Sequence, residues 1–116
     1  MDDAAFSDDF CRFLRAFVPS VGAAELLLEL RARGEQGVQP RSHPDRLVLE
    51  SLAGQGVAAA LADGFVYRAS GEIDACVATL AQAYRERPVT LFRVIYALRD
   101  GRVQSFADAF RVRKKD

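Results

Sequence analysis

The chain has 116 residues, of which 50% are hydrophobic and 28% are charged, and its 16 basic and 16 acidic residues leave no net charge. This composition is typical of a globular domain and excludes a disordered chain, so we expect a single domain over residues 1–116. The neutral charge also argues against a dedicated nucleic-acid binder, because such proteins gain most of their non-specific affinity from an excess of basic residues.

The first third of the chain predicts two amphipathic helices. Apolar residues recur every three or four positions over Phe6–Phe17, and a second helical pattern covers Val21–Arg33 after a break at Pro19. Ser20 is a suitable N-cap for the second helix, and Gly34 suits its C-terminal end. We expect the apolar stripes of both helices to lie in one core.

The middle of the chain predicts a helix, a turn, a shorter helix and a strand. Pro44–Leu52 begins with a proline, which the first turn of a helix tolerates well. Gly54–Gly56 then predicts a turn, and the alanine-rich segment Val57–Asp63 predicts a short helix. The β-branched and aromatic residues of Phe65–Ala69 favour a strand.

The last third predicts mainly helix. Glu72–Arg87 carries one apolar stripe and forms a long helix, which Pro88 ends. Leu91–Leu98 is apolar on almost every side, which fits either a buried helix or a strand, and we favour the helix. Ser105 is suited to cap a final short helix, followed by a frayed basic tail at residues 111–116.

The residue types that catalysis and metal binding require are sparse. His43 is the only histidine, and it is far in sequence from Cys11 and Cys76, whereas structural zinc ligands usually come in close pairs. No phosphate-binding loop and no nucleophile elbow occurs. We therefore expect no enzymatic activity, no cofactor and no metal. A thiol sensor at Cys11 is a weaker hypothesis, which requires that Arg12 and Arg15 lower the pKa of the thiol.

The order of elements from Val21 to Ala69 resembles a winged helix-turn-helix. The resemblance implies a mainly α fold with a minimal β element, in which a winged-helix-like three-helix core over about 21–69 precedes a C-terminal helical extension over about 72–112. The charged ending also resembles small, uncharacterised bacterial proteins. Because winged helices are common in bacterial transcription regulators, the resemblance implies a role in transcription control. The acidic N-terminus and the lack of a long apolar run predict a cytoplasmic protein without a membrane span.

The resemblance makes Val57–Asp63 the recognition helix, yet this segment has no Arg, Lys, Asn or Gln to read bases. DNA binding would therefore rest mainly on phosphate contacts. The candidate nucleic-acid-binding residues are Arg41, His43, Arg46, Gln55, Arg68, Arg113, Lys114 and Lys115. A full wing also has two strands, and the predicted strand would need a partner from near Val38.

The hypothesis that we prefer is a non-enzymatic interaction module that forms a homodimer, or holds a protein partner, through its apolar C-terminal half. The candidate interface residues are Leu91, Phe92, Ile95 and Tyr96. The variant Ile95→Asp is then expected to dissociate the dimer without unfolding the chain.

A DNA-binding regulator that acts through phosphate contacts is the alternative hypothesis. A continuous basic face formed by Arg41, Arg46 and Arg68 would favour DNA binding. Scattering of these arginines, or their pairing with Asp45 and Glu50, would favour the interaction module.

Overall fold

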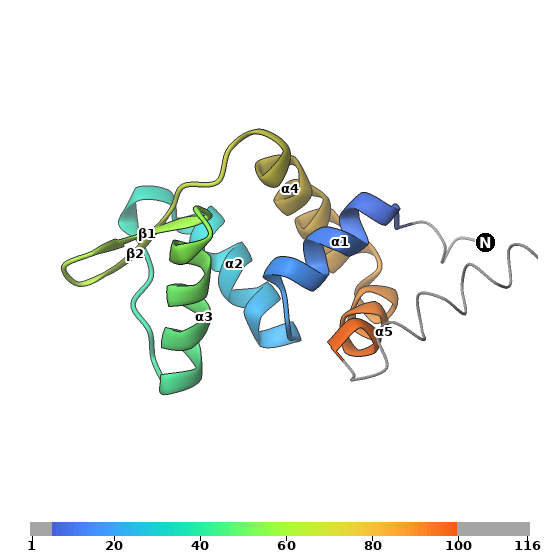
Figure 1. The fold of residues 1–116 in the computed structure, drawn as a ribbon, viewed down its shortest axis with the longest axis horizontal. Coiled ribbons are helices and arrows are strands. Elements are labelled where there is room, and N and C mark those ends of the chain that lie inside the picture. The colour runs from blue at the N-terminus through green and yellow to red at the C-terminus, as the bar shows by residue number, and fades with distance from the viewer. Residues whose placement is uncertain (1–5, 100–116) are drawn as a thin grey trace, which may run out of the picture.

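The computed structural model of the protein describes residues 6–99. This part contains five α-helices and a two-stranded antiparallel sheet, which confirms a mainly α fold with a minimal β element (Figure 1). The elements in chain order are α1 (Asp8–Phe17), α2 (Val21–Arg33), the 3-10 helix η2 (Gly34–Gln36), α3 (His43–Gly54), β1 (Ala58–Leu61), β2 (Gly64–Tyr67), α4 (Gly71–Glu86) and α5 (Pro88–Arg99).

Serine side chains begin three of the helices. In each case the hydroxyl accepts a hydrogen bond, 3.0 to 3.2 Å long, from the backbone N–H three residues further on; the three are Ser7, Ser20 and Ser42. These caps satisfy N–H groups that have no partner within the helix. The predicted helix Val21–Arg33 is confirmed to the residue, and those predicted over 6–17, 44–52 and 72–87 are confirmed with ends shifted by one or two residues.

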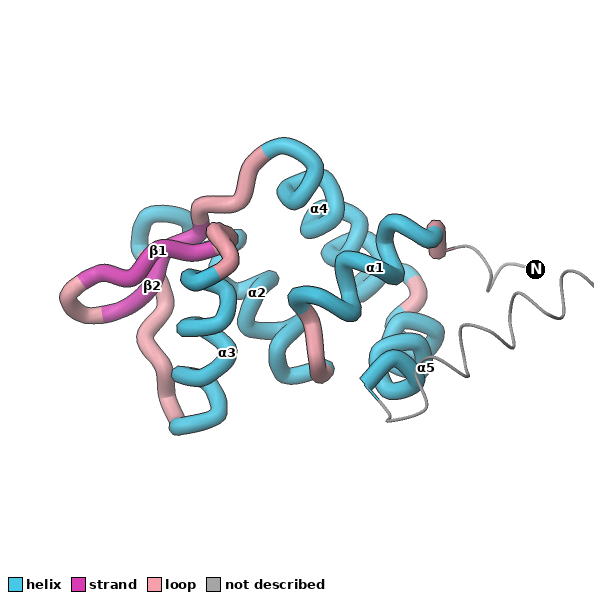
Figure 2. Tube along the Cα trace, viewed as in Figure 1, coloured by secondary structure: helices cyan, strands magenta, loops and turns pink. Residues whose placement is uncertain are grey.

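One hydrophobic cluster joins all five helices to the sheet. Each helix contributes a fully buried side chain, namely Leu14, Leu27, Leu49, Leu80 and Ile95. Figure 2 shows α2 in the middle of the molecule, with α1, α4 and α5 on one side and α3 with the β-hairpin on the other. The core therefore extends on both sides of α2, from the helices α1, α4 and α5 to α3 and the β-hairpin.

The segment that fitted both helix and strand is helix α5. Leu91 and Ile95 are 0% and 1% exposed, and they lie in the core instead of on a surface. Phe92 is half-buried and its ring lies 5.7 Å from that of Tyr84, in an edge-to-face contact. The expectation that Ile95→Asp leaves the fold intact is therefore wrong, because the variant places a carboxylate in the core.

The prediction of a recognition helix at Val57–Asp63 is wrong, because residues 58–61 form the strand β1. β1 pairs antiparallel with β2, and Leu61 lies opposite Gly64 across the turn. A segment this short gains little from the helix preference of alanine, because nucleating a helix is costly. Pairing with β2 and the complete burial of Val57 outweigh that preference.

The strand partner that was expected near Val38 is present as a single bridge. The Val38 N–H donates to the Phe65 carbonyl oxygen at 2.8 Å, and the Phe65 N–H donates to the Val38 carbonyl oxygen at 2.9 Å. Gly37 and Gly64 permit this approach, because a Cβ would lie 2.9 Å from the Phe65 oxygen at Gly37 and 2.8 Å from the Val38 oxygen at Gly64. β1 takes the place of the expected second helix of the motif. The structure therefore does not confirm the winged-helix arrangement, which stays a prediction.

The hairpin is also connected to α4. The Tyr67 hydroxyl on β2 donates a 2.6 Å hydrogen bond to Asp74 Oδ1 near the start of α4. Burial, and then Asp74, raise the pKa of Tyr67 well above its usual value. In residues 6–99, no helix has the length and apolar character that a membrane crossing requires.

Candidate interaction surface at the β-hairpin

Arg41 lies in the loop before α3 and is neutralised by a carboxylate of α2. Its Nη1 and Nη2 donate to Glu29 Oε1 and Oε2 at 3.3 and 2.5 Å, a two-bond contact between side chains twelve positions apart in sequence. The hydrogen bond with Glu29 raises the pKa of Arg41, and the Arg41 backbone N–H donates to Asp45. The guanidinium therefore offers little net charge to a phosphate group.

The other predicted DNA contacts within residues 6–99 also meet groups of the chain itself. Arg46 Nη1 lies 3.9 Å from Glu50 Oε2, and Arg68 Nη1 donates to the Tyr67 carbonyl oxygen at 3.1 Å. The pairing of Arg41 and Arg46 with carboxylates is the arrangement that favours an interaction module over DNA binding.

The other predicted nucleic-acid contacts are the uncharged residues Gln55 and His43 and three residues of the basic tail. Gln55 donates from Nε2 to Ser51 Oγ at 3.2 Å, and His43 is exposed at the start of α3. The tail residues Arg113, Lys114 and Lys115 lie outside the described residues.

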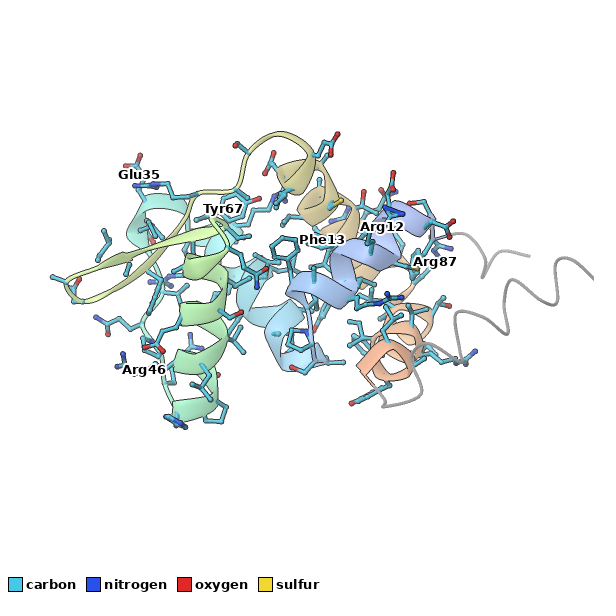
Figure 3. All side chains as sticks on the ribbon, in the orientation of Figure 1. Arg12, Phe13, Glu35, Arg46, Tyr67 and Arg87 are labelled. Carbon is cyan, nitrogen blue, oxygen red and sulfur yellow. The ribbon has the colours of Figure 1, made fainter. Side chains whose placement is uncertain are left out.

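Two grooves lie next to the hairpin, and the loop residues Gln39 and Pro40 line both of them. The first, which we call the α3–hairpin groove, has a volume of about 510 Å³. Its lining includes Arg46, Glu50 and Ala53 of α3 and Ala60, Leu61 and Gly64 of the hairpin. The second, with a volume of about 460 Å³, is bordered by Glu29, Arg33, Arg41 and Asp63. Figure 3 shows Arg46 on the side of α3 toward which the hairpin protrudes.

Large apolar side chains are exposed both at the hairpin end and at the α5 end of the fold. Leu47 of α3 is 53% exposed and Leu61 of β1 is 50% exposed, whereas Val89 and Tyr96 of α5 are 64% and 55% exposed. Leu61 borders both grooves. The hairpin end thus combines exposed apolar groups with concave surface.

The outer edge of β1 offers backbone groups for hydrogen bonding. The Arg68 N–H donates to the Val57 carbonyl oxygen at 2.8 Å, and this bond fixes which residues direct their backbone toward β2. Because the direction alternates along an antiparallel strand, Ala58 and Ala60 direct their N–H and C=O groups away from β2. Ala58 is only 4% exposed, but Ala60 is exposed. Within residues 6–99, no hydrogen bond engages these Ala60 groups.

The predicted interface residues on α5 are divided by the structure. Leu91 and Ile95 lie in the core, Phe92 is half-buried, and Tyr96 is exposed. Sequence reasoning missed Val89, although the helical spacing from Phe92 and Tyr96 places it on the same side of the helix. It also missed Leu61, because the segment Val57–Asp63 was predicted to form a helix.

The thiols do not have the property that a redox sensor requires. Burial, followed by Asp8, raises the pKa of Cys11, and the opposing effect of Arg15 is smaller. Burial also raises the pKa of Cys76. A sensor thiol needs a lowered pKa, so the raised pKa of Cys11 argues against this hypothesis. Among residues 6–99, no three His, Cys, Asp or Glu side chains are grouped to hold a metal ion.

Comparisons with protein-family models, with curated proteins and with solved structures find no match for this chain. Its function is therefore inferred from its own residues.

Proposed function

We propose that this protein is a non-enzymatic interaction module that docks a protein chain, either a second copy or a different protein, at its hairpin end, with a regulatory role in transcription suggested by the winged-helix resemblance. One observation carries the proposal: at this end, the apolar Leu61 is half exposed beside a groove whose arginine is paired with a carboxylate. Docking surfaces for proteins have few unpaired charges at their centre and expose apolar groups beside concave surface.

The pairing of the arginines weighs against the alternative function, a DNA-binding regulator. Phosphate recognition depends on cationic side chains that neutralise phosphate groups and release the counterions condensed on the DNA. Each such contact adds to the salt dependence of binding. Glu29 accepts hydrogen bonds from both terminal nitrogens of Arg41, so a phosphate group would compete with this carboxylate for the guanidinium. A phosphate group would also compete with Glu50 for Arg46, although that ion pair is longer, at 3.9 Å.

The α5 end is the weaker candidate for a docking surface. Val89 and Tyr96 are exposed there, but Leu91 and Ile95, which were expected to strengthen an interface, are in the core. At the hairpin end, exposed side chains are accompanied by unpaired backbone groups of Ala60. Backbone hydrogen bonds provide a way to recognise an added strand that the α5 end does not offer.

The first test is fluorescence anisotropy with labelled duplex DNA at low and then physiological salt. We expect no binding in either condition. A matched control is the double variant Glu29→Gln and Glu50→Gln, which frees both arginines and is expected to bind DNA more tightly than the parent does. Binding of the parent with a steep salt dependence would refute the proposal and support the DNA-binding regulator.

The second test places a photo-crosslinking amino acid at position 61 in living cells. Position 85 on α4, where Arg85 is exposed, serves as the control. We expect protein adducts from position 61 and far fewer from position 85. Adducts that nuclease treatment removes, or equal yields of protein adducts from both positions, would count against a protein-docking surface at the hairpin.

A further inference from the structure

β1 is the open edge of the small sheet. On the opposite edge, the backbone of Val38 bonds to that of Phe65 in both directions. β1 reads Ala58-Ala59-Ala60-Leu61, with no charge and no proline, and its register with β2 is continuous. Natural edge strands usually carry charges, prolines or bulges that prevent pairing with another strand. β1 has no charge and no proline, and its short length of four residues is the protection that it keeps.

We infer that the strand that pairs with this edge is β1 of a second copy of the chain, an inference that rests on the proposed docking surface. The two strands run antiparallel across a twofold axis at Ala60. Each Ala60 N–H then donates to the carbonyl oxygen of Ala60 in the other copy, which satisfies the groups that are unpaired in the single chain. The two hairpins form one continuous sheet.

The side chains of β1 are complementary to themselves in this register. A twofold axis at Ala60 sets Leu61 of one copy opposite Ala59 of the other. Leu61 is 50% exposed in the single chain and Ala59 is half-buried, so the larger side chain packs over the smaller one. Residues 58–62 contain no charged side chain, and the pairing therefore brings no like charges together.

The charges of α3 beside this edge do not oppose the pairing. Arg46 and Glu50 lie four positions apart and border the groove next to Ala60 and Leu61. Because Arg46 and Glu50 are paired within one chain and carry no net charge together, they do not repel the same pair of a second copy. The chain as a whole has no net charge that would repel a second copy.

The number of open edges limits the assembly to a dimer. In the part of the chain that the structure describes, the sheet exposes the edge of β1, whereas Val38 bonds to Phe65 on the edge of β2. Pairing of two β1 edges uses the open edge of both copies. An isologous contact of this kind closes on itself and does not extend into a filament.

The test is sedimentation velocity with the full chain at concentrations up to about 1 mM, which detects even weak association. We expect a dimer. Leu61→Lys puts a charge into the contact and should weaken the dimer at least about tenfold. Ala60→Pro removes an outward N–H without removing a bond to β2 and should act in the same direction. Val89→Lys is the matched control, because Val89 is 64% exposed on α5, at the other end of the fold.

Circular dichroism and thermal melting check that each variant is folded. A parent that stays monomeric at every concentration overturns the inference. A dimer that Val89→Lys dissociates and Leu61→Lys does not also overturns it, and assigns the contact to α5. The proposed function is separable: a monomeric parent that still gives protein adducts from position 61 keeps the docking surface, whereas salt-dependent DNA binding by the parent removes it.

Discussion

The packing of α5 predicts a large loss of stability when Ile95 is shortened. Ile95 is 1% exposed and lies in the cluster that α5 shares with α1, α2 and α4, next to the fully buried Leu91. Replacing a buried isoleucine by alanine costs about 2–5 kcal/mol, through lost burial and the cavity left behind. Elements on several sides limit collapse around the cavity, so we expect about 3–4 kcal/mol for Ile95→Ala. This is a large share of the roughly 5–15 kcal/mol that holds a typical domain folded.

The measurement is urea unfolding followed by far-ultraviolet circular dichroism, with comparison of the midpoint and the slope. Val89→Ala is the control, because Val89 is 64% exposed on the same helix and its truncation should change the free energy of unfolding by about 0.5 kcal/mol or less. Ile95→Asp should abolish the cooperative transition, since it buries an unpaired carboxylate. A loss below about 1 kcal/mol for Ile95→Ala would refute the reasoning and show that α5 is not held on the core.

Further predictions concern the hairpin and a thiol. Gly64→Ala should destabilise the fold by about 1–3 kcal/mol, because its φ of 157° is strained for alanine and the Cβ would lie 2.8 Å from the Val38 oxygen; a melting temperature equal to that of the parent would contradict this. Tyr67→Phe should cost about 1 kcal/mol in urea unfolding through loss of the 2.6 Å hydrogen bond to Asp74, and no change would mean that water replaces it fully. Because burial raises the pKa of Cys11, its thiolate fraction is low at mildly alkaline pH, and iodoacetamide should alkylate it more slowly in the native chain than in urea. The rate of alkylation of the native chain should increase as the pH rises toward the raised pKa. Faster alkylation in the native chain than in urea would contradict this prediction.

The helices were determined largely by local sequence. Ser20 accepts its cap hydrogen bond and Gly34 ends α2, so the predicted bounds of this helix were confirmed to the residue. Helical spacing of apolar residues also gave α4, and Pro44 gave the first turn of α3. These signals are reliable because caps, proline and amphipathic spacing act within one or two turns of the chain.

The hairpin was decided by the tertiary structure. The helix preference of Ala58–Ala60 amounts to a few tenths of a kcal/mol per residue, which is less than strand pairing and the burial of Val57 supply. The sequence indicated a strand at residues 65–69 and a partner near Val38, and both contribute to the sheet. The second partner, β1, pairs with β2 as far as Gly64, the first residue of β2, which tolerates the close approach of the Val38 carbonyl group because it has no Cβ.

The candidate surface shows the same division between local and long-range causes. Composition alone gave the neutral charge and the scarcity of catalytic residue types. Whether Arg41 was free to bind phosphate depended on Glu29, which belongs to another helix, and whether Leu91–Leu98 formed an interface depended on which of its sides met the core. Spacing along the chain determines which residues share a helix face, because helix geometry is regular. Only the packing of the helices decides which face is covered, because that depends on contacts between residues distant in sequence.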